Sequence, residues 1–234
     1  MNIPGAEKVL SWEFWFTMAL CVHLIAGTVA LLSFWVPLVT AKGSKLHIHS
    51  GMTFIASVGV TVACGVIMTV MHHFDPLNPP ASIAKTAFFL YLCLFTLGAA
   101  WHGLRVYLLK PPAPQQVIME KFNAAFIIFF GLLTALTGLK EGNMLYTLFP
   151  FIGIGLGIKQ YLFWNTWPPE KFTDLMIEHM RSMISCVIAS LTAFCVIAVP
   201  RIFGANPESL ILWFGPTVAL VPLIIYWQIR LKNA

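Results

Sequence analysis

The sequence contains few charged residues: Asp, Glu, Lys and Arg together make up 10% of the 234 positions. A soluble globular domain carries about 25% of such residues, so this scarcity excludes an ordinary water-soluble domain. The net charge is +5, but the basic residues lie mainly in the links between apolar runs. This charge therefore does not indicate nucleic-acid binding.

Several sequence patterns of catalytic and metal sites are also missing. The five cysteines all lie within apolar runs and include no Cys-x-x-Cys pair, which excludes a disulfide framework and a zinc ribbon. There is no Gly-x-Ser-x-Gly or His-Glu-x-x-His motif and no cluster of acids typical of a proton-driven transport path. Any chemistry must therefore come from isolated polar residues in apolar surroundings.

Long apolar runs are what the sequence does contain. Hydrophobic residues make up 59% of the chain, and its mean hydropathy is +0.82. Because about 20 apolar residues span a bilayer as a helix, we predict one all-α membrane domain over residues 1–234, with the bilayer as its partner. The seven predicted spans are 12–39, 49–71, 82–108, 117–139, 144–164, 178–200 and 209–229. Trp164, near the end of the fifth, is interpreted as an interfacial aromatic anchor.

The Lys and Arg residues are distributed unequally between the two sides of these spans. Ten fall on one side and four on the other. Cytoplasmic loops carry the excess of basic residues, so we predict an inner-membrane protein with its N-terminus outside and its C-terminus in the cytoplasm. The ten are Lys42, Lys45, Arg105, Lys110, Lys121, Lys159, Lys171, Arg181, Arg230 and Lys232, against Lys8, Lys85, Lys140 and Arg201.

Ionisable residues within or beside membrane helices are candidates for a functional site, because they are expensive to place there. Near the predicted cytoplasmic face these are His47, His102, Glu178 and His179, with Arg105 and Arg181 within about a turn of the histidines. Three imidazoles and a carboxylate are suitable ligands for a metal ion, and pairs of imidazoles for haem iron. The arginines are suited to haem propionates, a phosphate headgroup or another anion.

Two further histidines, His23 and His49, differ from this group in their position. His23 lies about 16 Å along the first predicted span, at 1.5 Å per residue, so we expect it to have a partner. His49 is two residues from His47 and faces away from it, which makes His47 the preferred ligand of the two. A purely structural role, in which the histidines hydrogen-bond to neighbouring helices, stays open.

Three short motifs carry a resemblance to a known family. They are His23-Leu-Ile-Ala-Gly27, Lys42-Gly-Ser-Lys-Leu-His47-Ile-His-Ser-Gly51, and Glu178-His179-Met-Arg181-Ser-Met183 followed by Thr192-Ala-Phe194. With these motifs the chain resembles the bacterial seven-helix membrane proteins named domain of unknown function 2306. The resemblance implies the same membrane architecture and singles out His23, His47 and His179. It implies no reaction, because the family has no assigned activity.

Three functional hypotheses are compatible with these residues. The first is a redox protein in which histidines bind haem b, or another metal, and exchange electrons with quinone. The second is a zinc hydrolase acting on a lipid amide or ester, in which His47, His102 and His179 hold zinc and Glu178 activates water. The third is a transporter, a sensor or an accessory subunit of a larger membrane complex.

Overall fold

A computed structural model of the protein describes residues 6–75, 78–108 and 114–233. Every regular element in these ranges is helical, and no strand occurs in them. Six of the described helices are long and apolar enough to cross a membrane. The predicted all-α, multi-pass membrane architecture is therefore confirmed in its helical content and in the presence of several helices that could span a membrane. Lys110, which was counted on the predicted cytoplasmic side, lies outside the described residues.

The helices follow one another with short connections. They are α1 (Ala6–Ser33), α2 (Trp35–Val39), α3 (Lys45–His73), α4 (Ile83–Leu108), α5 (Pro114–Lys140), α6 (Met144–Leu148), α7 (Pro150–Asn165), α8 (Phe172–Phe203) and α9 (Leu210–Lys232). The first predicted span corresponds to α1 and α2 together. The second, fourth and sixth predicted spans fall within α3, α5 and α8. The third and seventh begin one residue before α4 and α9 and otherwise lie within them.

The fifth predicted span, 144–164, differs from its prediction because it is divided into the short helices α6 and α7. Pro150 begins α7 at its first turn, where the missing N–H of proline costs no hydrogen bond. At 16 residues, α7 is about 24 Å long and shorter than a usual membrane span. It is therefore not among the six helices that meet the criterion of length and composition.

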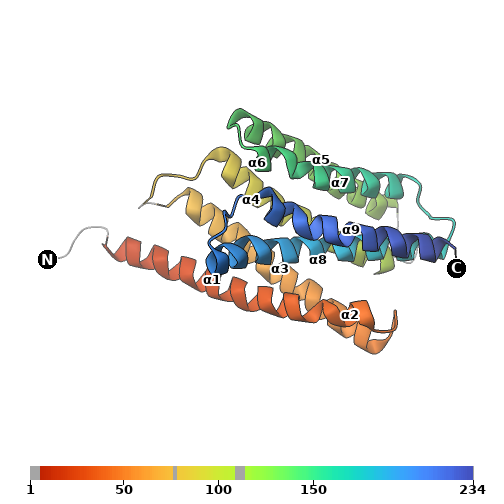
Figure 1. The fold of residues 1–234 in the computed structure, drawn as a ribbon. Helices are drawn as coiled ribbons and strands as arrows, with labels where there is room; N and C mark the ends of the chain where they lie inside the picture. The colour runs from red at the N-terminus through yellow and green to blue at the C-terminus, as the bar shows by residue number, and fades with distance from the viewer. Residues whose placement is uncertain (1–5, 76–77, 109–113, 234) are drawn as a thin grey trace. The chain divides into compact units, whose positions relative to one another are not determined.

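The chain divides into two compact units, Met1–Cys93 and Leu94–Ala234. In the first unit, α1 and α3 run side by side in opposite directions (Figure 1). Gly27 on α1 lies at this contact, and a Cβ added there would lie at an ordinary van der Waals distance of 3.9 Å from Thr61 Cγ2 on α3. Close packing of small residues is typical of helices that associate within a membrane.

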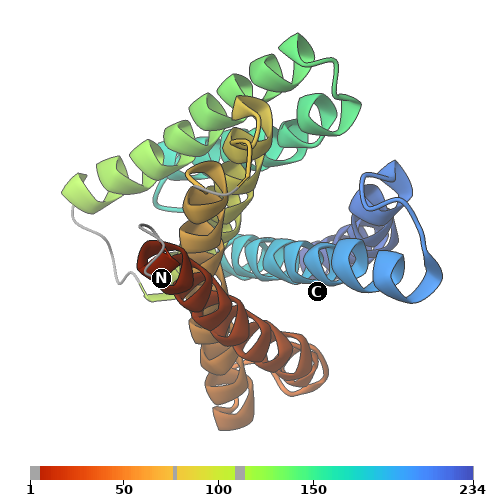
Figure 2. The ribbon, with the colours of Figure 1, turned by 90° about the vertical axis from the view of Figure 1, so that its left-hand side faces the viewer.

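The second unit contains two antiparallel helix pairs, α5 with α7 and α8 with α9 (Figure 2). A Cβ added at Gly157 on α7 would lie 2.9 Å from Ile128 Cγ1 and 3.2 Å from the carbonyl oxygen of Ala124 on α5. At one end of this pair, Lys121 Nζ donates to Asn165 Oδ1 over 3.0 Å. The absence of a side chain at Gly157 thus allows α5 and α7 to approach closely.

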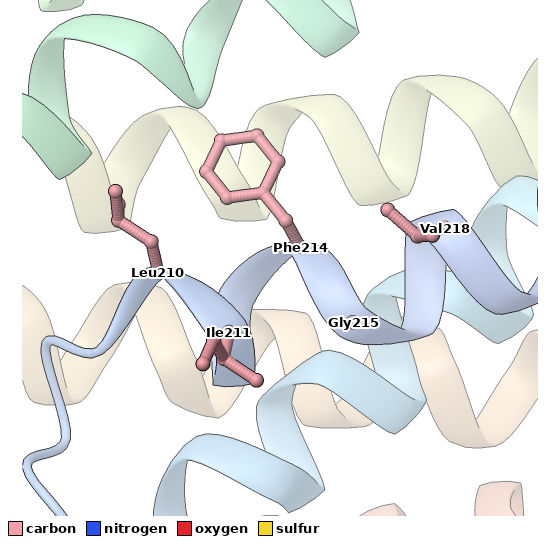
Figure 3. A pocket seen from close by; sticks show the side chains of 5 residues that line it. All are labelled: Leu210, Ile211, Phe214, Gly215 and Val218. Atoms are coloured by element: carbon pink, nitrogen blue, oxygen red, sulfur yellow. The ribbon is translucent and has the colours of Figure 1, made fainter.

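Helix α9 presents mainly apolar side chains outside its contact with α8. A hollow of about 420 Å³ on α9 is lined by Leu210, Ile211, Phe214, Gly215 and Val218. Leu210 and Phe214 point to one side of the helix and Ile211 to the other (Figure 3). None of these side chains is polar, so the hollow offers contact with lipid chains and no polar chemistry.

Candidate functional site

The polar residues of the second unit are arranged around the C-terminal half of α4. Trp101 and His102 are neighbours there, and successive residues of a helix point about 100° apart. Trp101 is 47% exposed, whereas His102 is 1% exposed. The two side chains therefore contact different helices.

His102 is held between α7 and α8. Trp164 Nε1 on α7 donates to His102 Nδ1 over 2.9 Å, and His102 Nε2 lies 3.5 Å from Glu178 Oε2 on α8. Because an indole N–H can only donate, Nδ1 must be the acceptor in this pair. A neutral His102 therefore carries its proton on Nε2 and presents it to the Glu178 carboxylate.

Glu178 is the acidic centre of this arrangement. It is buried, and its Oε1 accepts a hydrogen bond from Arg181 Nη1, one turn further along α8. A buried carboxylate without a partner would be strongly destabilising. The arginine and the histidine together supply the donors that Glu178 needs, so α4, α7 and α8 are connected by one buried polar network.

A second buried carboxylate, Glu120, connects α4 with α5. Its residue is 2% exposed, and Oε1 accepts from Arg105 Nε at 2.9 Å and from Trp101 Nε1 at 3.2 Å. The Arg105 guanidinium carbon also lies 5.3 Å from the centroid of the Trp101 ring, a cation–π distance. Glu120 was not among the predicted site residues, although an acid three residues inside a predicted span was a usable signal.

His179 makes a different contact with α4 from that of its neighbour Glu178. Its Nδ1 lies 2.8 Å from the carbonyl oxygen of Gly103, and its ring centroid lies 5.3 Å from that of Tyr107. A Cβ added at Gly103 would lie 2.9 Å from Ser182 Cβ. The glycine therefore lets α8 approach closely enough for His179 to donate to the α4 backbone.

The two candidate histidines of the first unit also contact backbone carbonyl groups. His23 Nδ1 lies 2.9 Å from Thr61 O, and His47 Nδ1 lies 3.1 Å from Pro37 O. Lys42 Nζ donates to the same Pro37 carbonyl over 2.7 Å, and burial lowers the pKa of Lys42.

On α3, Thr61 is 14 residues beyond His47, about 21 Å along the helix. His23 and His47 therefore cannot ligate the same iron.

A metal site would require several of the predicted ligand residues to lie close together. Among the described residues, no group of three or more His, Cys, Asp and Glu side chains is placed to hold a metal ion. Arg105 and Arg181, which were predicted to bind an anion, each pair with a carboxylate. His49 is exposed, and its Nδ1 lies 2.7 Å from Lys45 O of its own helix.

Two buried residues of α7 differ from the sequence predictions: Trp164 was predicted incorrectly, and Gln160 was not predicted to be buried. Trp164 is 1% exposed and bonded to His102, so its interpretation as an interfacial anchor is incorrect. Gln160, one turn earlier, is buried, and its Oε1 has no hydrogen-bond partner within the described part of the chain. In an apolar glycine-rich run, nothing local to the sequence distinguishes a tryptophan facing lipid from one facing the bundle.

Removing the Trp164 hydrogen bond should destabilise the protein. Trp164→Phe is expected to lower the free energy of unfolding by about 1–3 kcal/mol, because it leaves the buried His102 Nδ1 without a donor. Trp167→Phe is the matched control, since the indole N–H of Trp167 has no hydrogen-bond partner in the described ranges. Denaturant unfolding in detergent measures both; equal losses for the two variants would contradict the assigned role.

No family model, curated protein or solved structure matches this chain. The histidines and the two buried ion pairs are therefore the basis for a functional proposal.

Proposed function

We propose that this chain is a membrane redox protein that binds haem b through one or more of His23, His47 and His179. The observation that carries the proposal is that all three histidines make the same kind of hydrogen bond. In each, the ring Nδ1 faces a backbone carbonyl oxygen. A carbonyl can only accept, so Nδ1 carries the proton and the ring lone pair is on Nε2. Histidines that ligate metals typically hold their second N–H in this way.

We also propose that the chain belongs to the family named domain of unknown function 2306, because the motifs that carry this resemblance contain the same three histidines. His102 is not among the proposed ligands, because its Nδ1 accepts the Trp164 N–H and its Nε2 faces Glu178. Bound haem would supply one-electron transfer, with quinone as the proposed partner. The carbonyls of Thr61, Pro37 and Gly103 would orient the ligand rings.

The donor set fits haem at the histidines and less well at the arginines. Arg105 and Arg181 already neutralise Glu120 and Glu178, so neither arginine brings an uncompensated positive charge to a haem propionate. The proposed ligands therefore provide most of the specificity for haem.

We also propose seven spans in a bacterial inner membrane, with α6 and α7 together as the fifth. The N-terminus would then lie outside and the C-terminus in the cytoplasm, in agreement with the distribution of basic residues. Reporter fusions at the two ends measure this orientation. Both ends on the same side would contradict the seven-span arrangement.

Absorption spectroscopy tests the haem proposal. Detergent-purified protein is expected to show a Soret band and, after dithionite reduction, the α band of a b-type cytochrome, with metal analysis on the same sample. At least one of His23→Ala, His47→Ala and His179→Ala is expected to lose the haem. His49→Ala is the matched control and should retain it, because His49 is exposed and bonded within its own helix turn. A colourless protein that contains no iron would refute the proposal.

A non-enzymatic role, as a transporter, sensor or accessory subunit, is the second candidate. The observation in its favour is that two of these histidines join different helices: His23 links α1 to α3, and His179 links α8 to α4. Such bonds stabilise a bundle without any cofactor. Colourless, metal-free protein would favour this role, whereas stoichiometric zinc would favour the lipid hydrolase.

A further inference from the structure

One exposed face of α4 combines an apolar stripe with an arginine. Leu97, Trp101 and Arg105 recur every four residues, a spacing that aligns side chains on one side of a helix. Leu97 is 48% exposed and Trp101 is 47% exposed, and the Arg105 side chain is 20% exposed. The stripe therefore leads from apolar surface to a guanidinium three residues before α4 ends.

The guanidinium is fixed in place, yet only part of its donor capacity is used. Arg105 Nε donates to Glu120 Oε1, and the group lies over the Trp101 ring. An arginine has five N–H donors. The N–H groups on its two terminal nitrogens have no hydrogen-bond partner within residues 6–75, 78–108 and 114–233. Arg105 is thus an oriented donor whose remaining N–H groups are available to a ligand.

We propose that this face binds a membrane phospholipid, with the lipid phosphate on the terminal N–H groups of Arg105 and an acyl chain along Trp101 and Leu97. A planar guanidinium suits the phosphate oxygens, which it can contact through two parallel hydrogen bonds. The adjoining apolar side chains match an acyl chain and would offer nothing to a free anion. A tryptophan beside the headgroup region is typical of membrane interfaces.

Glu120 limits the strength of this site and makes the site testable. Its buried carboxylate balances the charge of Arg105, so the phosphate is bound mainly through hydrogen-bond geometry. In Glu120→Gln the amide oxygen can still accept from Trp101 and Arg105, but the opposing charge is lost. The variant should therefore bind an anionic lipid more tightly than the unaltered protein does.

Lipid titration measures the effect. Detergent-purified protein is titrated with dioleoyl phosphatidylglycerol, and bound lipid is counted by native mass spectrometry. Glu120→Gln is expected to strengthen binding about fivefold, the effect of about one basic charge near a lipid surface. The double variant Glu120→Gln, Arg105→Gln should lose this gain and fall below the unaltered protein. It also leaves no unpaired buried charge that would prevent folding.

Arg230→Gln is the matched control, because Arg230 is an exposed arginine in the last turn of α9. Arg230→Gln removes one positive charge, as Arg105→Gln does, and should leave the lipid affinity of the α4 site unchanged. Equal lipid affinity in Glu120→Gln and the double variant would overturn the proposal. Equal affinity for inorganic phosphate and for the lipid would also overturn it, because the acyl chain would then contribute nothing.

Discussion

Replacing Glu178 by Leu is expected to lower the free energy of unfolding by about 3–5 kcal/mol, the cost of removing one partner from a buried ion pair. The change leaves Arg181, whose side chain is 15% exposed, without its carboxylate. It also leaves the buried His102 Nε2–H without an acceptor. Urea or SDS unfolding in mixed micelles, followed by circular dichroism, measures the loss.

Two controls separate the charge from other effects of this substitution. Glu178→Gln retains an acceptor oxygen and should lose less stability than Glu178→Leu. Glu170→Leu removes an exposed acid and should change stability by about 0.5 kcal/mol or less. If Glu178→Leu were as stable as Glu170→Leu, the network around His102 would not contribute to the stability of the second unit.

Gly138→Ala is the second substitution expected to have a large effect. An added Cβ would lie 2.5 Å from the Tyr146 carbonyl carbon and 2.7 Å from Thr147 N. These are backbone atoms of α6, which cannot rotate away as a side chain can. Overpacking of this kind costs about 1–3 kcal/mol, and sometimes more, so we expect a loss at or above the upper end of that range.

Gly155→Ala is the matched control for this prediction. Gly155 lies within α7, and no heavy atom lies within 4 Å of an added Cβ there. Alanine stabilises a helix by up to about 1 kcal/mol relative to glycine, so Gly155→Ala should be neutral or stabilising. The same unfolding measurement applies to both variants. A loss in Gly155→Ala as large as that in Gly138→Ala would contradict the close contact between α5 and α6.

The sequence predicts most of the helices because the requirement for a membrane helix is local. A run of about 20 apolar residues satisfies it without reference to any other part of the chain. The fifth predicted span was the exception, because hydropathy averages over the run from 144 to 164. It does not register that Pro150 starts a new helix, a break that depends on backbone geometry.

The sequence predicted the residues of the candidate site but not their interaction partners. His102, Glu178, His179, Arg105 and Arg181 were singled out as costly polar groups in apolar surroundings. Their partners were not foreseen: Trp164 for His102, Glu120 for Arg105, and the Gly103 carbonyl for His179. Each of these partners lies on another helix.

The sequence by itself determined that this is a helical membrane protein and which of its polar residues are unusual. The tertiary structure alone decided which of them meet, because helical periodicity specifies a face but not the helix that packs against it. It also decided that Glu120 on α5 is neutralised by Arg105 on α4, whereas Glu178 and Arg181 are three residues apart on the same helix. A buried charge is stable only beside its partner, and the distance between partners on different helices is a property of packing.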